Sequence, residues 1–505
     1  MYIHVDRDAT APPYKQIEDA IRGLIERGVL PFRARLPSTR DLASEVGVNR
    51  LTVHKAYQRL ETDGLITTKV GSGTFVSSRS LRTQTEPDLP GGLPEDPSLG
   101  VWGPLFVNPR LATRALPSMT YLKECSASFV YAAPPPDLFP VEEFRHCTNY
   151  ILKRRGAEVY RVGADASGLP SLKEYLIGWL AQHDIVATER TLVITTGCQQ
   201  TLDLTRKLLV GPDDSMLLEN PSFPGAVGAL SPSGTGLMAL PVHESAPPLD
   251  PSTLVNHQKR CKLMYVTPNF HNPTGLTMPL GRRRELADIA LQYSIPLIED
   301  DVFGALRYEG AAQPSLQSLC PRMVIHVGSF SKMLNPSLRL GWMVAPEPFA
   351  EQITVAKQAS DLHTSTLVQT AMDEFCRRGL MIRQLKRVRR VFRGRRDAMA
   401  EALHRYFPRD SRWSVPEGGL SMWVTLPDDM DTRDLLALAQ DRGVQFLPGA
   451  IFYFSGSRHN CMRLSFATEN EAVIDAGIRT LGDIIGKRRL RLIRPATCQD
   501  RRAVI

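Results

Sequence analysis

The sequence predicts two structural parts, a small helical unit that ends in a β-hairpin and a large α/β domain with a mostly parallel sheet. Its 505 residues are enough for two or three domains. Residues 12–78 carry helical periodicity and cap residues, whereas over residues 121–486 short apolar runs alternate with helical stretches. A Pro- and Gly-rich stretch separates the two and is predicted to be a linker over 79–120. Residues 487–505 form a basic tail.

The composition excludes several classes of protein. Apolar residues make up 43% of the chain and charged residues 23%, which are ordinary values for a globular chain and exclude a disordered or fibrous one. The sequence has neither a membrane-spanning apolar run nor the apolar segment of a secretory signal. Eight cysteines lie scattered without a CxxC pair. We therefore expect a cytoplasmic protein without a membrane or metal site.

The first unit has the order of elements of a winged helix. Residues 13–28 show helical spacing of apolar side chains. Ser38, with Asp41 three residues later, is predicted to cap a second helix that ends at Gly47, and Asn49 a third. Residues 65–76 then alternate like two strands around a Gly-Ser-Gly turn. A helix, a helix-turn-helix and a hairpin in this order predict a winged helix-turn-helix.

A winged helix of this kind places the start of its third helix in the major groove of DNA, while the wing contacts phosphates. An alternative is that the polar residues at these places are simply exposed side chains of a winged helix that binds protein. The polar and basic residues in the corresponding places are Asn49, Arg50, Thr52 and His54, with Arg40 on the preceding helix and Lys69 in the wing.

The segments LPSTR, NRLTV, KAYQRLETDG and GSGTFV together resemble the GntR-type winged helix nearly position for position. The resemblance implies binding of double-stranded DNA. The contacts that it implies are Arg40, Arg50, Thr52, His54 and the wing around Gly71.

In the body, polar residues follow successive predicted strands. Asn272, Asp300 and Lys332 are spaced by 28 and 32 residues, each at a strand end, and sites of doubly wound sheets form at those carboxyl ends. Individually each has a structural alternative: Asn272 as a turn residue, Asp300 as a helix cap, Lys332 as a surface amine, and Phe223 as a core side chain. Gly197, Cys198 and Gln199 begin a helix after a strand, where free N–H groups favour a phosphate.

Together these residues fit one cofactor. A lysine can form a Schiff base with an aldehyde, a strand-end aspartate suits a pyridinium nitrogen, and Ser329, Arg339 and a helix start suit a phosphate. These are the requirements of pyridoxal 5′-phosphate (PLP).

The body resembles the fold-type-I aminotransferases, with a mostly parallel sheet and a smaller C-terminal α+β subdomain. The resemblance implies that Lys332 is the catalytic residue that forms the internal aldimine. Asp300 would bond the ring nitrogen, Asn272 the phenolic oxygen, and Phe223 would stack on the ring. The phosphate ligands would be Ser329, Arg339 and the amides of Gly197, Cys198 and Gln199.

Three further positions follow from the same resemblance. Tyr160 would reach a phosphate from the partner subunit of a homodimer, and Arg463 would clamp the α-carboxylate of an amino acid. Phe303 stands where relatives usually carry a tyrosine that bonds the phenolic oxygen, so the chemistry of the aldimine is expected to be altered while the cofactor still binds.

A GntR-type winged helix joined to such a body resembles the MocR/GabR family of bacterial regulators. The resemblance implies a homodimeric transcriptional regulator that senses an amino acid or amine through aldimine formation and binds an operator with two half-sites. One alternative is a working aminotransferase that carries a winged-helix arm, and weak turnover is expected even in a regulator. The other is a dimerisation scaffold without cofactor, against which Lys332, Asp300 and Arg339 argue.

Overall fold

The computed structural model forms two compact units, residues 1–103 and 104–505. The residues that it describes are Val5, 12–26, Leu30, 34–63, 65–69, 73–76, 125–160, 165–231, 235–242, Leu249, Leu254, 261–456 and 458–493. The predicted linker, Gly71 of the wing and tail residues 494–505 lie outside this range. No helix in the described ranges is long and apolar enough to cross a membrane.

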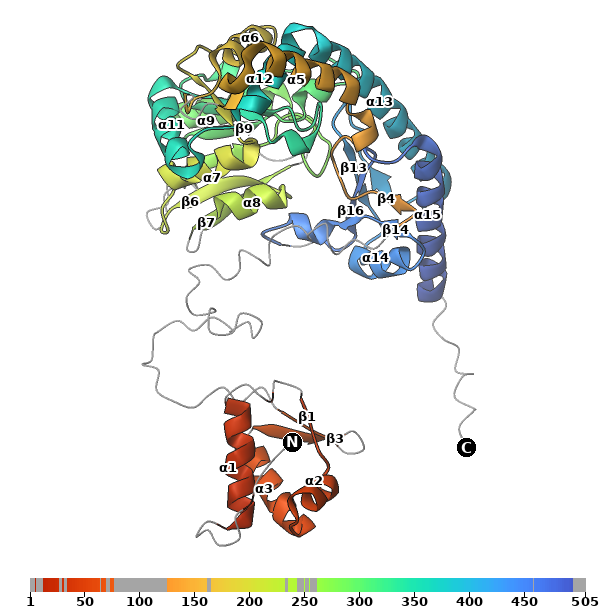
Figure 1. The fold of residues 1–505 in the computed structure, drawn as a ribbon. Helices are drawn as coiled ribbons and strands as arrows, with labels where there is room; N and C mark the ends of the chain where they lie inside the picture. The colour runs from red at the N-terminus through yellow and green to blue at the C-terminus, as the bar shows by residue number, and fades with distance from the viewer. Residues whose placement is uncertain are drawn as a thin grey trace. The chain divides into compact units, whose positions relative to one another are not determined.

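The first unit is a winged helix, as predicted (Figure 1). Ser38 accepts a hydrogen bond from the Asp41 amide at 3.2 Å at the start of the second helix, which Gly47 ends in the left-handed conformation with φ 72°. Asn49 caps the third helix. The short strand β1 was not predicted. The elements are α1 (Pro13–Glu26), β1 (Arg35–Leu36), α2 (Thr39–Val46), α3 (Arg50–Thr62), β2 (Ile66–Lys69) and β3 (Gly73–Val76), with an antiparallel sheet in the order β1-β3-β2.

The body is built on a seven-stranded sheet in which only β11 runs antiparallel to its neighbours. The mostly parallel sheet predicted from the sequence is confirmed, and strands β7 and β11 are added to it. In the order β5-β11-β10-β9-β8-β6-β7, the strands are β5 (Leu192–Thr195), β11 (Gly341–Val344), β10 (Val324–Ser329), β9 (Leu297–Asp300), β8 (Cys261–Val266), β6 (Ser215–Asn220) and β7 (Gly236–Pro241).

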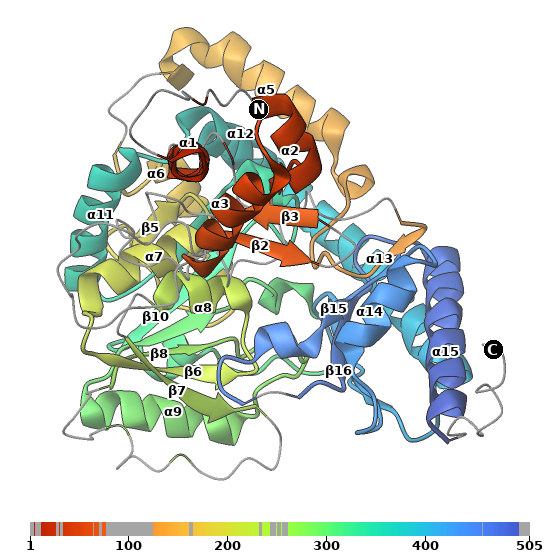
Figure 2. The same ribbon diagram turned by 90° about the horizontal axis from the view of Figure 1, so that it is seen from below.

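Helices cover both faces of this sheet, because side chains alternate between the faces along each strand. Leu218, Tyr265 and Ile298 pack with α7, α8 and α11, whereas Leu217 and Met264 pack with α9 and α10. Figure 2 shows α8 and α9 on opposite sides of β6 and β8. The helices are α5 (Val141–Arg155), α6 (Pro170–Ala181), α7 (Cys198–Leu209), α8 (Pro224–Leu230), α9 (Leu280–Tyr293), α10 (Leu316–Leu319), α11 (Glu347–Asp361) and α12 (Thr366–Arg377).

A smaller α+β subdomain follows, with a four-stranded sheet in the order β12-β13-β16-β15. Its last helix runs past residue 486, so the basic tail begins inside a helix. The elements are α13 (Leu380–Tyr406), β12 (Arg412–Trp413), β13 (Ser421–Thr425), α14 (Thr432–Gln440), β15 (Leu447–Pro448), β16 (Cys461–Ser465) and α15 (Glu471–Ile493), with β4 (Ala127–Ser128) and β14 (Val444–Gln445) as a separate parallel pair.

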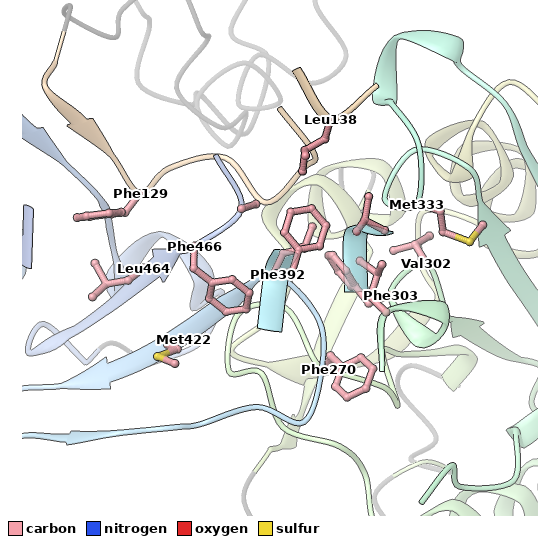
Figure 3. Packing of buried hydrophobic residues seen from close by; sticks show 14 of the residues in the cluster. Phe129, Leu138, Phe270, Val302, Phe303, Met333, Phe392, Met422, Leu464 and Phe466 are labelled. Atoms are coloured by element: carbon pink, nitrogen blue, oxygen red, sulfur yellow. The ribbon is translucent and has the colours of Figure 1, made fainter. Parts of the chain in front are cut away.

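One apolar cluster joins the large sheet domain to this subdomain (Figure 3). Phe303 and Met333 come from loops after β9 and β10, and they share the cluster with Phe392 of α13 and with Leu464 of β16. All four side chains are buried. The close packing of such a core holds the loop that carries Lys332 in a fixed position relative to β16.

Candidate cofactor and effector site

The carboxyl ends of adjacent strands bring the predicted residues to one edge of the sheet. Asp300 is the last residue of β9 and Ser329 the last of β10. Asn272 lies in the loop after β8, and Gly197 is the N-cap of the helix that follows β5. Residues far apart in sequence therefore share one site, as the geometry of open α/β sheets requires.

Asp300 is buried and only half satisfied. Its Oδ2 accepts a hydrogen bond from the Tyr265 hydroxyl at 2.8 Å, while Oδ1 is buried without a partner among the described residues. Burial raises the pKa of Asp300, against the opposing effect of the bond from Tyr265. A buried carboxylate oxygen without a donor is costly, so Oδ1 suits a cationic N–H group. Tyr265 was not among the residues predicted from the sequence, although a hydroxyl within an apolar strand needs a polar partner.

Lys332 lies in the loop after β10, where its Nζ donates to the Ala132 carbonyl at 2.8 Å. The ammonium lies over the ring of Phe303, 5.5 Å from its centroid. Burial lowers the pKa of Lys332, and the charges of Arg463 and Arg339 lower it further. More of the amine is therefore neutral and nucleophilic than in an exposed lysine. Phe303 offers an apolar face here and no hydroxyl.

The start of α7 is arranged for an anion. Gly197 has a φ of 87°, and a Cβ at this position would lie 2.8 Å from Nη2 of Arg339. Only glycine therefore allows the guanidinium to lie against the helix start. Arg339 itself is left-handed, with a φ of 48°, and its Nη2 donates to the Thr196 carbonyl at 3.1 Å. A guanidinium beside the free N–H groups of a helix N-terminus favours a phosphate.

The remaining predicted residues around α7 lie close by. Burial raises the pKa of Cys198 to about 12, with an added contribution from the charge of Asp300. Gln199 donates from Nε2 to the Gly225 carbonyl at 2.9 Å, and the Phe223 ring packs against the same glycine. Ser329 accepts a hydrogen bond from the Ser331 amide at 3.1 Å.

A second layer of side chains fixes the loop before α7. Asp361, at the end of α11, accepts hydrogen bonds from the Thr196 hydroxyl at 2.8 Å, from Gln200 at 2.7 Å and from Lys357 at 2.8 Å. This network holds the loop whose Thr196 carbonyl receives Arg339. This network was not predicted from the sequence, because Thr196 and Gln200 are about 160 positions from Asp361 and no motif connects them.

Arg463, on β16, is a buried cation whose partners are neutral. Nη1 donates to Oδ1 of Asn272 at 3.0 Å, Nη2 donates to the Val130 carbonyl, and Nε is buried without a partner among the described residues. The Phe452 ring lies 5.2 Å from the guanidinium carbon. Burial lowers the pKa of Arg463 to about 10. No described carboxylate pairs with it, so the site suits an incoming one.

Tyr160 stands apart from these residues. It ends the short 3-10 helix Gly156–Tyr160, and its side chain is 63% exposed. The structure of the single chain does not bring it into contact with the other predicted site residues.

The predicted DNA contacts gather at the starts of α2 and α3. Arg40, Arg50 and His54 are exposed, and Thr52 is partly buried. The Nε atom of Arg50 donates to the Thr39 hydroxyl at 3.3 Å, which orients the guanidinium, while no described carboxylate pairs with it. Asn49 uses its Oδ1 to cap the helix at the Leu51 amide, 2.9 Å away.

The residues of the body fit PLP. The unpaired Oδ1 of Asp300 suits a ring nitrogen, and the Lys332 amine suits an aldehyde. Asn272, which accepts a hydrogen bond from Arg463, adds a polar side chain. The helix start at Gly197, with the Arg339 guanidinium against it, suits a phosphate. Each requirement of the cofactor thus meets a group of matching charge.

Comparison with known proteins agrees with this assignment. Residues 142–481 match the family described as aminotransferase class I and II, and residues 13–76 match bacterial regulatory proteins of the gntR family. The HTH-type transcriptional regulator TauR of Rhodobacter capsulatus is 32% identical over 478 residues, 92% of this chain and 95% of TauR.

Other relatives match a smaller share of the chain. The 2-aminoadipate transaminase of Thermus thermophilus is 36% identical over 359 residues, 70% of this chain and 89% of its own length. The solved structure of LysN, an alpha-aminoadipate aminotransferase of the same species complexed with N-(5′-phosphopyridoxyl)-L-leucine, matches with a TM-score of 0.70 at 34% identity, covering 77% of this chain and 99% of LysN. The chain belongs to the aminotransferase class I and II family and, with its GntR-type winged helix, is a PLP-binding, DNA-binding transcriptional regulator of the MocR/GabR type.

Proposed function

We propose that the effector of this regulator is an amino acid, held by its α-carboxylate at Arg463 and by its amino group at the cofactor. The observation that carries the proposal is the buried guanidinium of Arg463, whose described partners are all neutral. Its charge also acts on Lys332, so the two groups belong to one electrostatic site. A bidentate pair with a carboxylate would compensate the buried charge.

The side chains divide the work of binding. Bound PLP supplies an aldehyde that primary amines attack and a ring that withdraws electrons. Asp300 would hold a proton on the ring nitrogen through Oδ1, and the hydrogen bond from the Tyr265 hydroxyl orients Asp300. Lys332 would hold the aldehyde group of the cofactor, and its lowered pKa would allow Nζ to take up or release a proton.

We also propose that the regulator is a homodimer that presents two winged helices to an operator with two half-sites. The support is the large exposed side chain of Tyr160, in the place where the resemblance expects a contact with the partner's phosphate. A two-fold arrangement of winged helices reads two half-sites. Effector binding would act by shifting the population between states that differ in DNA affinity.

The test is the visible absorption spectrum of the PLP-loaded protein, recorded during titration with a panel of amino acids and their decarboxylated amines. A band that shifts and stays with one amino acid supports sensing. A band that bleaches and returns with a keto acid supports the second function, transamination, which the presence of Lys332, Asp300 and Arg463 favours. A response to amines equal to that of the acids would contradict the role of Arg463.

A further inference from the structure

Leu51 is an apolar side chain in a polar setting. It is the second residue of α3 and is 73% exposed, more than any other large hydrophobic residue in the described ranges. Val53, Ala56, Tyr57 and Leu60 of the same helix are buried in the core of the winged helix. The helix therefore satisfies its apolar face without Leu51, which contributes nothing to that core.

The backbone at Leu51 is held in place, so the position of this side chain is defined. Its amide donates to the Asn49 side chain at 2.9 Å, and the next amide, of Thr52, donates to the Asn49 carbonyl at 2.9 Å. Arg50 is anchored beside it on Thr39 of α2. An apolar side chain thus projects from an ordered helix start, next to an oriented guanidinium.

Apart from Leu51, the exposed stripe of α3 is polar. Leu51, His54, Lys55 and Gln58 follow each other at helical spacing and are all exposed. Lys55 is held over the Tyr14 ring of α1, 4.2 Å from its centroid. Leu51 is the only apolar member of this stripe.

We propose that Leu51 reads a thymine by packing against its C5-methyl group in the major groove. The proposal rests on α3 being the helix that enters the groove. The thymine methyl is the apolar group among the base edges there, and apolar side chains recognise it by contact. A cytosine in its place has no C5-methyl group, so the leucine would lose this apolar contact. Arg50 and Leu51 would then read neighbouring base pairs.

The size of the effect follows from the methyl group. Burial of one such carbon contributes enough free energy to change affinity by about fourfold. Replacement of thymine by deoxyuridine removes only this methyl and leaves base pairing intact. With one contact in each half-site, a double replacement would weaken binding by about 16-fold.

The test uses the full-length, PLP-loaded protein and a random duplex library, from which the preferred sequence is selected in vitro. Each thymine of that sequence is then replaced singly by deoxyuridine, and the Kd is measured. We expect one thymine per half-site at which the replacement weakens wild-type binding by about fourfold. The Leu51→Ala variant should bind both duplexes equally, whereas the matched variant Gln58→Ala, on the same stripe, should keep the wild-type difference.

Two results would overturn the proposal. Sequence-selective binding in which no thymine is sensitive to deoxyuridine refutes the thymine contact, and this scan of the wild-type protein does not depend on any variant. An equal sensitivity in Leu51→Ala assigns the contact to another residue. If the protein selects no sequence at all, the role of α3 in reading DNA is refuted together with the thymine contact. That outcome differs from sequence-selective binding without a sensitive thymine, which refutes the contact alone.

Discussion

Replacement of Arg463 by methionine should separate effector binding from cofactor binding. Burial lowers the pKa of Arg463 to about 10, which means that the folded chain disfavours the charged form of this side chain. This cost is already present before an effector arrives. A carboxylate that enters meets a desolvated cation, and its two charge-assisted hydrogen bonds contribute about 1.5–3 kcal/mol each.

In Arg463→Met the effector loses these bonds, and a loss of about 3 kcal/mol of binding free energy corresponds to a decrease in effector affinity of roughly 100-fold. The thermal midpoint of the PLP-loaded protein should change little, because Arg463→Met removes the buried charge together with its two bonds to neutral oxygens. The assay is titration of the visible band with the amino acid that gives the largest shift and with the amine that lacks its carboxylate.

In wild-type protein the acid should bind far more tightly than the amine, and in Arg463→Met the two should become comparable. The matched control is Arg458→Met, which removes an exposed arginine five positions earlier in the chain. Acid affinity within threefold of wild type in Arg463→Met, with the preference for the acid intact, would refute the assignment of the carboxylate site.

Three further changes test other parts of the molecule. Tyr265→Phe removes the hydroxyl that donates to Asp300. Loss of this one hydrogen bond to a charged group should weaken PLP binding by about tenfold, as measured by cofactor titration. Unchanged PLP affinity would contradict the role of Tyr265 in holding Asp300. Arg50→Ala should weaken specific DNA binding by about 1–3 kcal/mol while the visible absorption band of the cofactor stays intact. An operator affinity equal to that of wild type in a mobility-shift assay would show that α3 is not the helix that reads the operator. Burial opposes the charge of Glu299 and His326, but their contact at 3.1 Å outweighs it, lowering the pKa of Glu299 and raising that of His326. The contribution of the Glu299 carboxylate to the free energy of unfolding is present above pH 4.5 and is lost as pH falls through its lowered pKa. The contribution of the His326 imidazolium is present below pH 6.5 and is lost as pH rises through its raised pKa. The stability difference between wild type and His326→Gln, from urea unfolding, should therefore be largest between these values and shrink toward pH 9; a flat difference would contradict a charged pair.

The sequence predicted those features of the body that depend on strand order. Asn272, Asp300 and Lys332 could be assigned to one site because parallel strands place their carboxyl ends at a common edge. The caps at Ser38 and Asn49 were also predictable, since a cap is a local hydrogen bond between near neighbours.

Features that depend on tertiary contacts were not predictable. Tyr265 lies in a strand whose residues are nearly all buried, and only the packing shows that its hydroxyl meets Asp300. Asp361 acts on a loop far away in sequence. Arg339 needs a left-handed backbone to lie over Gly197, and no sequence pattern specified that conformation.

The central claim is that one amino acid acts on both the cofactor site and the winged helix. The most direct measurement is operator affinity of the PLP-loaded protein across the same effector titration that is followed by the visible spectrum. The claim predicts that the two curves share a midpoint, and that Lys332→Ala binds the operator at the basal level without a lysine-bound band or an effector response. Operator affinity that stays constant while the cofactor band shifts to saturation would contradict it.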